Sequence, residues 1–322
     1  MRIQQRLLLV ALVALVALGC EATSNVGSGD DDSSADADTD GDSDADGDAD
    51  GDTDGDGDAD GDGDGDSHGC YAMDIVFVVD ISASMMEEQA NLDANFPEFI
   101  SMLDEYVSAD DTFAEYRVGV TNMSINGTFD SCTTTMGFDG ELFDGDSWSG
   151  DCGLGVDPWI DGPAPDMSTK FSCLAENPIP SGGGTDCGAE MPLEVVNQFS
   201  QKCAEGEVND GFYRKDEESL LVIVLLTDED EDSASPATPA IAKAALDELA
   251  GGEDRYVVVA IAGPDECTSE FGEAIEAVKV KEFIDLVPNG FFGDICEGDL
   301  WPSLQEALEL MTVACEELPD IE

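Results

Sequence analysis

The sequence predicts one α/β domain with a doubly wound, mostly parallel sheet flanked by helices. Three near-continuous apolar runs, at residues 75–79, 220–226 and 256–261, are typical of strands that are covered on both faces. Stretches with helical periodicity lie between such runs, as a doubly wound fold requires. Residues 70–318, about 250 in all, are enough for one large domain of this class.

The first half of this domain holds two predicted helices and a second strand. Apolar residues spaced by threes and fours predict a helix over 92–107, directly after the first strand. Pro97 should kink or split this helix, because proline lacks an amide proton. Residues 116–123 are expected to form the second strand, and residues 190–199 the helix that follows a glycine-rich loop.

The second half continues the alternation. Residues 241–249 predict the helix between the last two apolar runs. Pro302 suits the first turn of a final helix, which would carry Leu304, Leu308 and Met311 on one face. A further strand is expected at residues 283–287.

Oxygen-bearing side chains follow the predicted strands. Asp80, Ser82 and Ser84 form a D-x-S-x-S loop directly after the first apolar run, and Asp228 ends the run at 220–226. Thr185 stands on a glycine-rich loop between them. Open parallel sheets bind ligands outside the carboxyl ends of their strands, and carboxylates and hydroxyls suit Mg²⁺, Ca²⁺ or Mn²⁺. A competing interpretation is that Ser84 only caps the following helix.

These three loops together resemble the metal-ion-dependent adhesion site of von Willebrand factor type A (VWA) domains. The resemblance implies a VWA fold in which Ser82, Ser84 and Thr185 contact a divalent cation directly. By the same resemblance, Asp80 and Asp228 would bind the ion directly or through water, and a partner's Asp or Glu would complete its shell. The sequence departs from the family after Asp228, where an acidic run begins at the position of the usual glycine.

The resemblance does not cover residues 124–180, a segment rich in Gly, Asp, Cys and aromatic residues. A structureless loop of this length would be unusual in a compact domain, so we expect disulfides to brace it. The segment leaves the sheet at the same end as the metal loops. It is therefore either the part that sets partner specificity or a decoration without a binding role.

The N-terminus predicts export. Arg2 and Arg6 precede an apolar stretch too short to span a bilayer, so residues 1–19 are expected to be a signal peptide. The sequence at 17–20 resembles the lipobox of bacterial lipoproteins, which implies acylation of Cys20 and a lipid anchor in the cell envelope. We expect the anchor to lie in the outer membrane, and the sequence does not distinguish its surface face from its periplasmic face. A plain secretory signal is the alternative.

Residues 20–69 predict a disordered acidic linker. Every even-numbered residue from 36 to 66 is Asp, and such a segment has no apolar surface to bury. The whole chain has a formal net charge of -64, so nucleic acid and anionic membrane surfaces are not expected partners. The domain would end at 318, followed by a short tail at 319–322.

Cysteine usage agrees with export. The chain has 10 cysteines, and an export signal beside them indicates an oxidising compartment. When Cys20 is set aside for lipid, an odd number remains, so at least one cysteine is free or pairs with another molecule. In the VWA fold the two ends of the domain lie close together, and we therefore expect a disulfide between Cys70 and Cys315.

Catalysis is not expected. The single histidine, His68, stands in the linker, so neither a Ser-His-Asp triad nor a histidine-ligated zinc can form. Asp80 and Asp228 could act as acid and base, but holding a metal would occupy both. The sequence thus predicts a membrane-anchored protein that binds a protein or peptide partner through a divalent metal. The alternative is a structural component of an envelope assembly, in which the metal only stabilises the fold.

Overall fold

The computed structural model describes residues 70–105, 115–129, 132–134, 137–147, 150–175, 190–269 and 272–319. The chain divides into two compact units, Met1–Asp62 and Gly63–Glu322, and all described residues belong to the second. The predicted signal peptide, the lipid attachment at Cys20 and the acidic linker lie outside the described residues.

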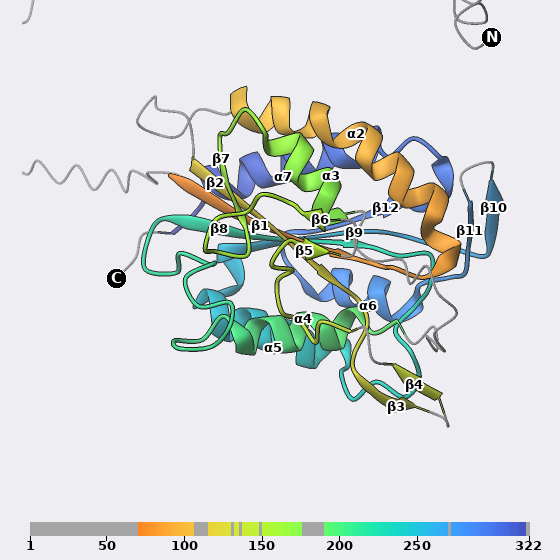
Figure 1. Cartoon of the computed structure of the whole chain (residues 1–322). Coiled ribbons are helices and arrows are strands. Elements are labelled where there is room, and N and C mark those ends of the chain that lie inside the picture. Colours follow the sequence, from red (N-terminus) through yellow and green to blue (C-terminus); the bar gives the residue numbers. More distant parts are fainter. Residues whose placement is uncertain are drawn as a thin grey trace, which may run out of the picture. The chain divides into compact units, whose positions relative to one another are not determined.

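A mixed sheet forms the centre of the described unit (Figure 1). Its six strands lie in the order β12-β9-β8-β1-β2-β7. All neighbouring pairs are parallel except β2 with β7, which is antiparallel at the edge. The strands are β1 (Ala72–Val79), β2 (Glu115–Asn122), β7 (Ile160–Gly162), β8 (Ser219–Leu226), β9 (Tyr256–Ala262) and β12 (Gly290–Asp294).

The direction of strand addition reverses between β1 and β8. From β1 the chain adds β2 and β7 on one side, and it then crosses to add β8, β9 and β12 on the other. Such a reversal opens a crevice at the carboxyl ends of the two strands where it occurs, and ligands of open α/β sheets bind there. The sequence prediction of a doubly wound, mostly parallel sheet is confirmed.

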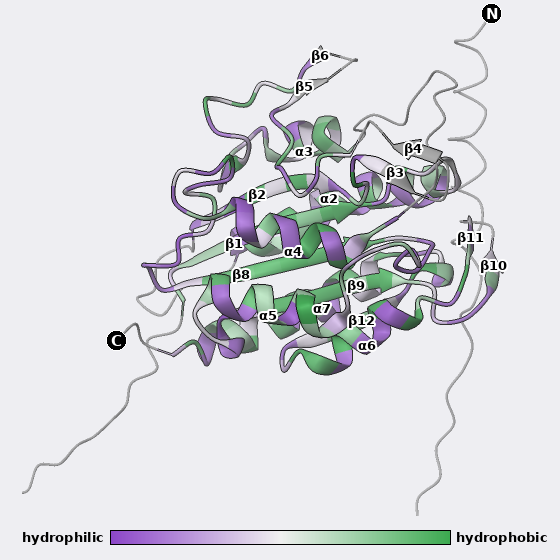
Figure 2. Cartoon of the chain, turned by 90° about the horizontal axis from the view of Figure 1, so that it is seen from below, coloured by the Kyte–Doolittle hydropathy of each residue, from purple (hydrophilic) through white to green (hydrophobic). Residues whose placement is uncertain are grey.

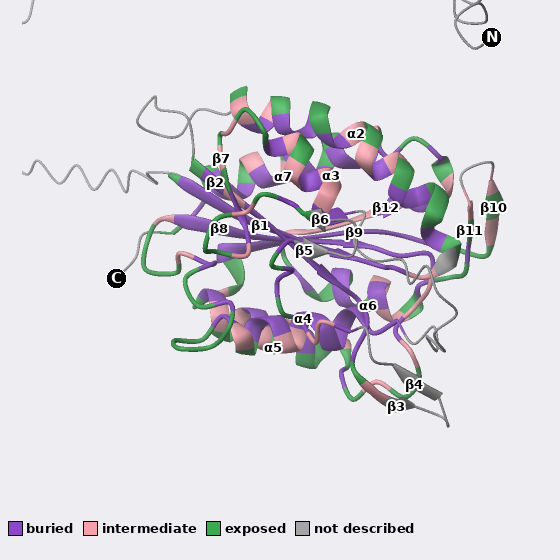
Figure 3. Cartoon of the chain, in the orientation of Figure 1, coloured by how far each residue is buried: buried purple, intermediate pink, exposed green. Residues whose placement is uncertain are grey.

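Helices cover both faces of the sheet (Figure 1). Successive residues of β1 face opposite sides: Ile75 and Phe77 join one apolar core, and Val76 and Val78 join the other. The central strands β1 and β8 are buried along their whole length and mostly apolar (Figures 2 and 3). On one face lie α2 (Met86–Glu105), α3 (Met167–Ala175) and α7 (Trp301–Glu316), and on the other α4 (Pro192–Lys202), α5 (Pro239–Ala250) and α6 (Val278–Leu286).

Two sequence expectations are corrected. Residues 283–287 do not form a strand, because Val280, Phe283 and Ile284 bury one face of α6, and the edge strand is β12 instead. Pro97 does not split its helix, since α2 runs through it without a break. Proline is tolerated here because it is exposed, so water can reach the carbonyl group that loses its amide partner.

The segment at 124–180 has structure of its own. Its described parts form two small hairpins, the edge strand β7 and the helix α3, which packs on α2. A disulfide joins Cys152 to Cys173 of α3, so the expected disulfide brace is present. The hairpins pair β3 (Gly127–Phe129) with β4 (Cys132–Thr134) and β5 (Asp146–Ser147) with β6 (Gly150–Asp151).

A disulfide also closes the domain. Cys70, just before β1, is bonded to Cys315 near the end of α7, with 4.9 Å between their Cα atoms. The Cys70 amide donates to the Cys315 carbonyl at 2.9 Å, so the backbone supports the same junction. Among the described residues, the unpaired cysteine is Cys203, which is buried at the end of α4. Disulfides are typical of exported proteins.

One buried ion pair fixes the amino end of the sheet. Asp74 of β1 is fully buried, and its carboxylate accepts from the Arg214 guanidinium at 2.7 Å and the Arg214 amide at 2.8 Å. The Ser219 hydroxyl donates to the same carboxylate at 2.7 Å. The hydrogen-bonding capacity of the Asp74 carboxylate is therefore satisfied.

In the part of the chain that the structure describes, no helix is long and apolar enough to cross a membrane.

Candidate metal centre

Asp80 and Asp228 come together at the reversal point of the sheet. Each follows one of the two central strands, and the Asp80 amide donates to the Leu226 carbonyl at 3.0 Å, so strand pairing continues to the site. The Thr227 hydroxyl donates to Asp80 Oδ2 at 2.9 Å. Asp80 is 1% exposed and Asp228 3%. Their carboxyl groups also interact directly with each other.

The D-x-S-x-S loop folds back over these two acids. The Ser82 amide donates to Asp80 Oδ1 at 2.7 Å, and Gln89 of α2 donates to the Asp80 carbonyl at 2.5 Å. The Ser82 and Ser84 hydroxyls lie 2.9 Å apart, and the nearby Ser84 hydroxyl partly offsets the rise in the pKa of Asp228. Four of the five predicted ligands thus meet in one place. The fifth, Thr185, lies outside the described residues.

The structure adds two glutamates that the sequence analysis did not select. Glu190, just before α4, interacts electrostatically with Asp80 and shares a hydrogen bond with Glu229. Glu88 of α2 interacts electrostatically with Asp228. Glu190 is 4% exposed and Glu88 2%. Neither stands in a recognisable motif, so only their spatial neighbours identify them.

Burial makes ionisation of this cluster costly. Withdrawal from water is the largest cause in every case, and it raises the pKa of Asp80 to about 7, of Glu88 to about 7 and of Glu190 to about 9. The pKa of Asp228 is raised by the same cause. Neighbouring carboxylates raise the pKa values of Asp80, Glu88 and Glu190 further. Four buried acids without a balancing cation are therefore unfavourable.

The unsatisfied atoms of the cluster indicate what would balance it. Within the described residues, Asp228 Oδ1, Glu88 Oε2 and Glu190 Oε2 are buried and have no hydrogen-bond partner. Buried oxygen atoms of this kind need a donor or a cation. The donors at the site are carboxylates and hydroxyls, which are hard oxygen ligands that fit Mg²⁺, Ca²⁺ or Mn²⁺. The residues present thus fit a divalent cation.

In the acidic run after Asp228, Glu229 interacts with Glu190 of the cluster, whereas Asp230 and Glu231 bind helix ends. Glu231 accepts from the amides of Leu193 and Glu194 at 2.6 and 3.3 Å, and so caps the N-terminus of α4. Asp230 accepts from the Lys279 amide at 2.9 Å in the first turn of α6. Both acids serve helix ends, where negative charge is favourable.

A small hairpin lies against the same loops. It consists of β10 (Cys267–Ser269) and β11 (Gly272–Ala274), and a disulfide joins Cys267 to Cys296 in the short helix η4 (Ile295–Glu297). The Ile275 amide donates to the Asp228 carbonyl at 2.9 Å. A Cβ atom at Gly272 would lie 1.5 Å from Glu88 Oε1, and the residue has φ +136°, so only glycine fits. This segment thus contacts both the loop after β8 and helix α2.

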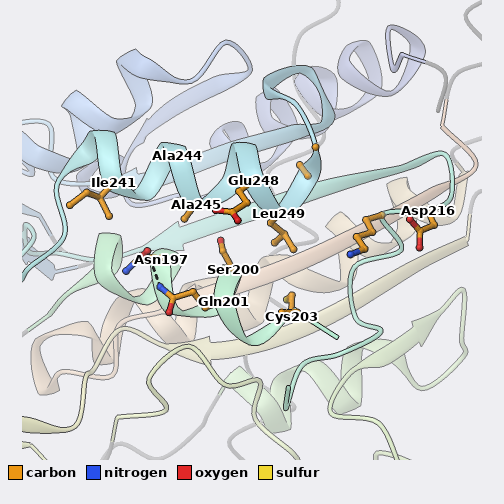
Figure 4. A pocket seen from close by; sticks show the side chains of 14 residues that line it. Asn197, Ser200, Gln201, Cys203, Asp216, Ile241, Ala244, Ala245, Glu248 and Leu249 are labelled. Carbon is orange, nitrogen blue, oxygen red and sulfur yellow. Dashed lines mark hydrogen bonds between the residues drawn. The ribbon is translucent and has the colours of Figure 1, made fainter. Parts of the chain in front are cut away.

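Two other features do not qualify as functional centres. Donor atoms of Cys267, Asp294 and Cys296 lie within 4.8 Å of one another, but the two sulfur atoms are bonded to each other and are not thiolate ligands. A groove of about 910 Å³ lies between α4 and α5 (Figure 4). Its lining includes Lys215, which precedes β8, so the groove extends toward the end of the sheet opposite to the acidic cluster.

No family model and no curated protein matches the chain. Among solved structures, it is similar to proximal thread matrix protein 1 from the mussel byssus, with 16% identity, 76% of this chain and 46% of that chain covered, and a TM-score of 0.38. It is also similar to the pilus adhesin SpaC from Lactobacillus rhamnosus GG, with 14% identity, 75% of this chain and 30% of that chain covered, and a TM-score of 0.38. A third similar structure is the manganese-loaded TRAP protein from Plasmodium vivax, with 15% identity, 73% of this chain and 74% of that chain covered, and a TM-score of 0.32.

The present chain spans less than half the length of the mussel protein and less than a third of SpaC. Similarity at this level does not assign a function. The class that the chain's own fold and cluster define is a doubly wound α/β domain with an all-oxygen acidic site at its reversal point.

Proposed function

We propose that the chain is a VWA-type binding protein that holds a divalent cation at Asp80, Ser82, Ser84 and Asp228. One observation carries this proposal: Asp228 Oδ1 is buried without a partner, beside three other oxygen-bearing side chains, at the reversal point of the sheet. The cation would supply the positive charge that this cluster lacks. It would also offer a coordination position to an oxygen atom of another molecule.

The partner that fits this chemistry is a protein or peptide that presents an Asp or Glu carboxylate. Carboxylate oxygen is a preferred ligand of Mg²⁺, Ca²⁺ and Mn²⁺. Catalysis is not part of the proposal, because the only histidine of the chain, His68, stands in the predicted linker. The expected lipid at Cys20 would anchor the protein in the cell envelope.

Partner capture tests this proposal. The mature protein would be incubated with envelope extract in calcium or magnesium, and the bound proteins would be compared with those bound in chelator. We expect specific partners to be lost in chelator and with Asp80→Ala, because both remove the cation. Asp216→Ala is the matched control, since Asp216 is exposed and precedes β8 at the opposite end of the sheet. Binding that survives both chelator and Asp80→Ala contradicts the proposal.

The second candidate is a structural component of an envelope assembly. Glu190 and Glu88 favour it, because each adds a buried oxygen without a hydrogen-bond partner near Asp80 or Asp228, and an ion that offsets this acidic charge would stabilise the fold. In that case Asp80→Ala would lower the stability of the domain, while capture of partners would persist at temperatures where the variant remains folded. The same pair of measurements therefore separates the two functions.

A further inference from the structure

The hairpin of β10 and β11 is fixed at its base beside the proposed cation site. The disulfide between Cys267 and Cys296 joins its first strand to η4, and Ala274 of its second strand is buried in the core. Directly after β11, the Ile275 amide donates to the Asp228 carbonyl at 2.9 Å. The chain that leaves the hairpin therefore runs along the loop that carries Asp228.

The D-x-S-x-S loop lies against the same hairpin. This loop continues into the short helix η2 (Ala83–Met85) and then into α2, and β11 contacts both helices (Figure 1). Ser84 of η2 is exposed, whereas Asp80 and Asp228 are buried. The cluster therefore meets solvent on the side of η2, between the start of α2 and the segment that follows β11.

Three large apolar side chains are exposed on these two segments. Met86, at the start of α2, is 56% exposed, and it stands two residues after Ser84. Ile275 and Val278, on the connection from β11 to α6, are 51% and 46% exposed. Single exposed apolar residues are common, but these three border one polar cluster, as apolar residues at binding sites do. They offer apolar contact area beside the proposed cation.

The same two segments also carry exposed acids, at Glu87, Glu273 and Glu276. The nearby lysines of α6 are already engaged. Lys279 donates to two backbone carbonyl groups of the loop after β8, and Lys281 pairs with Glu276 at 3.1 Å. This surface therefore has surplus negative charge in the described part of the chain. A partner that brings a carboxylate to the cation needs positive charge next to it, because like charges across an interface repel.

We propose that Met86, Ile275 and Val278 form an apolar rim that selects a partner segment in which an Asp or Glu is flanked by an apolar side chain and by lysine or arginine. This inference rests on the cation site proposed above. The cation would bind the carboxylate, the rim would cover the apolar neighbour, and Glu87 and Glu273 would pair with the basic residues. The side chains of the rim carry no oxygen ligand, so they would set which partner binds and leave cation affinity unchanged.

Defined peptides test this assignment before any partner is known. An array of acetylated pentapeptides with a central Asp or Glu and varied flanking residues would be probed with the full mature protein in calcium, in magnesium and in chelator. We expect the peptides that bind only with the cation to have a large apolar residue beside the acid and Lys or Arg at the outer positions. Replacing the central acid by its amide should abolish their binding.

Substitutions in the rim should lower peptide affinity without changing cation affinity. Ile275→Ser and Met86→Ser should each weaken binding of the selected peptides about fivefold to tenfold, because each removes apolar contact area. The calcium-induced rise in the midpoint of thermal unfolding should stay at its wild-type value in both. Glu273→Lys should weaken binding of peptides with basic flanks and reduce its dependence on salt.

Val313→Ser is the matched control and should bind peptides as the wild type does. Val313 is a valine of α7 that is 50% exposed, and it lies two residues before Cys315, whose disulfide to Cys70 stands at the opposite end of the sheet.

The outcomes distinguish the rim from the cation site. Cation-dependent peptide binding that is lost with Asp80→Asn but shows no apolar or basic preference, or is unchanged by Ile275→Ser and Met86→Ser, overturns the rim and leaves the cation site intact. Peptide binding that persists in chelator and with Asp80→Asn overturns the cation-dependent function itself. An array without any cation-dependent binder overturns the rim as a peptide-binding surface, and partner capture then decides the fate of the proposed function.

Discussion

The pH dependence of stability in the absence of divalent cations follows directly from the buried acids. In the folded protein the pKa of Asp80 is raised from 3.8 to about 7, chiefly because the carboxyl group is withdrawn from water. The pKa values of Glu88 and Glu190 are raised from 4.5 to about 7 and about 9 for the same main reason. Between pH 4 and 7 the folded chain therefore binds more protons than the unfolded chain, and its stability falls as the pH rises.

Asp80 alone sets the scale of this effect. One pKa unit corresponds to about 1.4 kcal/mol, so a shift of roughly three units costs on the order of 4 kcal/mol by the time the pH passes 7. Saturating calcium would stabilise the ionised carboxylates, lower their pKa values and remove the loss. The stability gained from calcium should therefore grow from almost nothing at pH 4.5 to several kcal/mol at pH 8.

Urea unfolding at a series of pH values, in chelator and in calcium, measures this difference. We expect the free energy of unfolding to fall from pH 4.5 to pH 7.5 in chelator and to change little in calcium. Asp80→Asn should show a shallower fall and no response to calcium, since it lacks both the titrating group and the ligand. Identical pH profiles with and without calcium would refute the reasoning, as would stability that rises with pH in chelator.

Three further predictions concern stability away from the titrating cluster. Arg214→Ala should cost about 3–5 kcal/mol in urea unfolding, because it leaves the buried Asp74 carboxylate without its partner; a loss below about 1 kcal/mol would contradict this. Replacing Cys70 and Cys315 together by serine should cost about 2–5 kcal/mol, since the bridge closes a separation of 245 residues; unchanged stability would show that the bridge is dispensable. Glu231→Ala should cost about 1–2 kcal/mol through loss of the α4 cap, and an unchanged midpoint would oppose that role.

Much of the fold could be predicted because its central strands are apolar on both faces. The runs that became β1, β8 and β9 are continuous, and only a buried strand or helix has that pattern. The prediction failed at 283–287, where a short apolar run fits a strand and a helix equally well. This segment forms part of helix α6, because Val280, Phe283 and Ile284 bury one helical face against the core.

The candidate site could be predicted only where polar residues follow a recognisable strand. Asp80 and Asp228 satisfy that condition, and the structure brings them together. Glu190 could not be found, because its position depends on backbone contacts with Met123 and Asp232 that lie far from it in sequence. The acidic run after Asp228 was also ambiguous in sequence, since only the folded chain shows which of its carboxylates cap helices.

Anomalous scattering from manganese tests the central claim most directly, because it locates the ion independently of any effect on stability or binding. Crystals of the protein grown or soaked in manganese would be measured near the manganese absorption edge. The account predicts one strong anomalous peak within coordination distance, roughly 2.2 Å, of oxygen atoms of Asp80 or Asp228 and of the Ser82 and Ser84 hydroxyls. Full data from well-ordered crystals with no peak beside these side chains would contradict it.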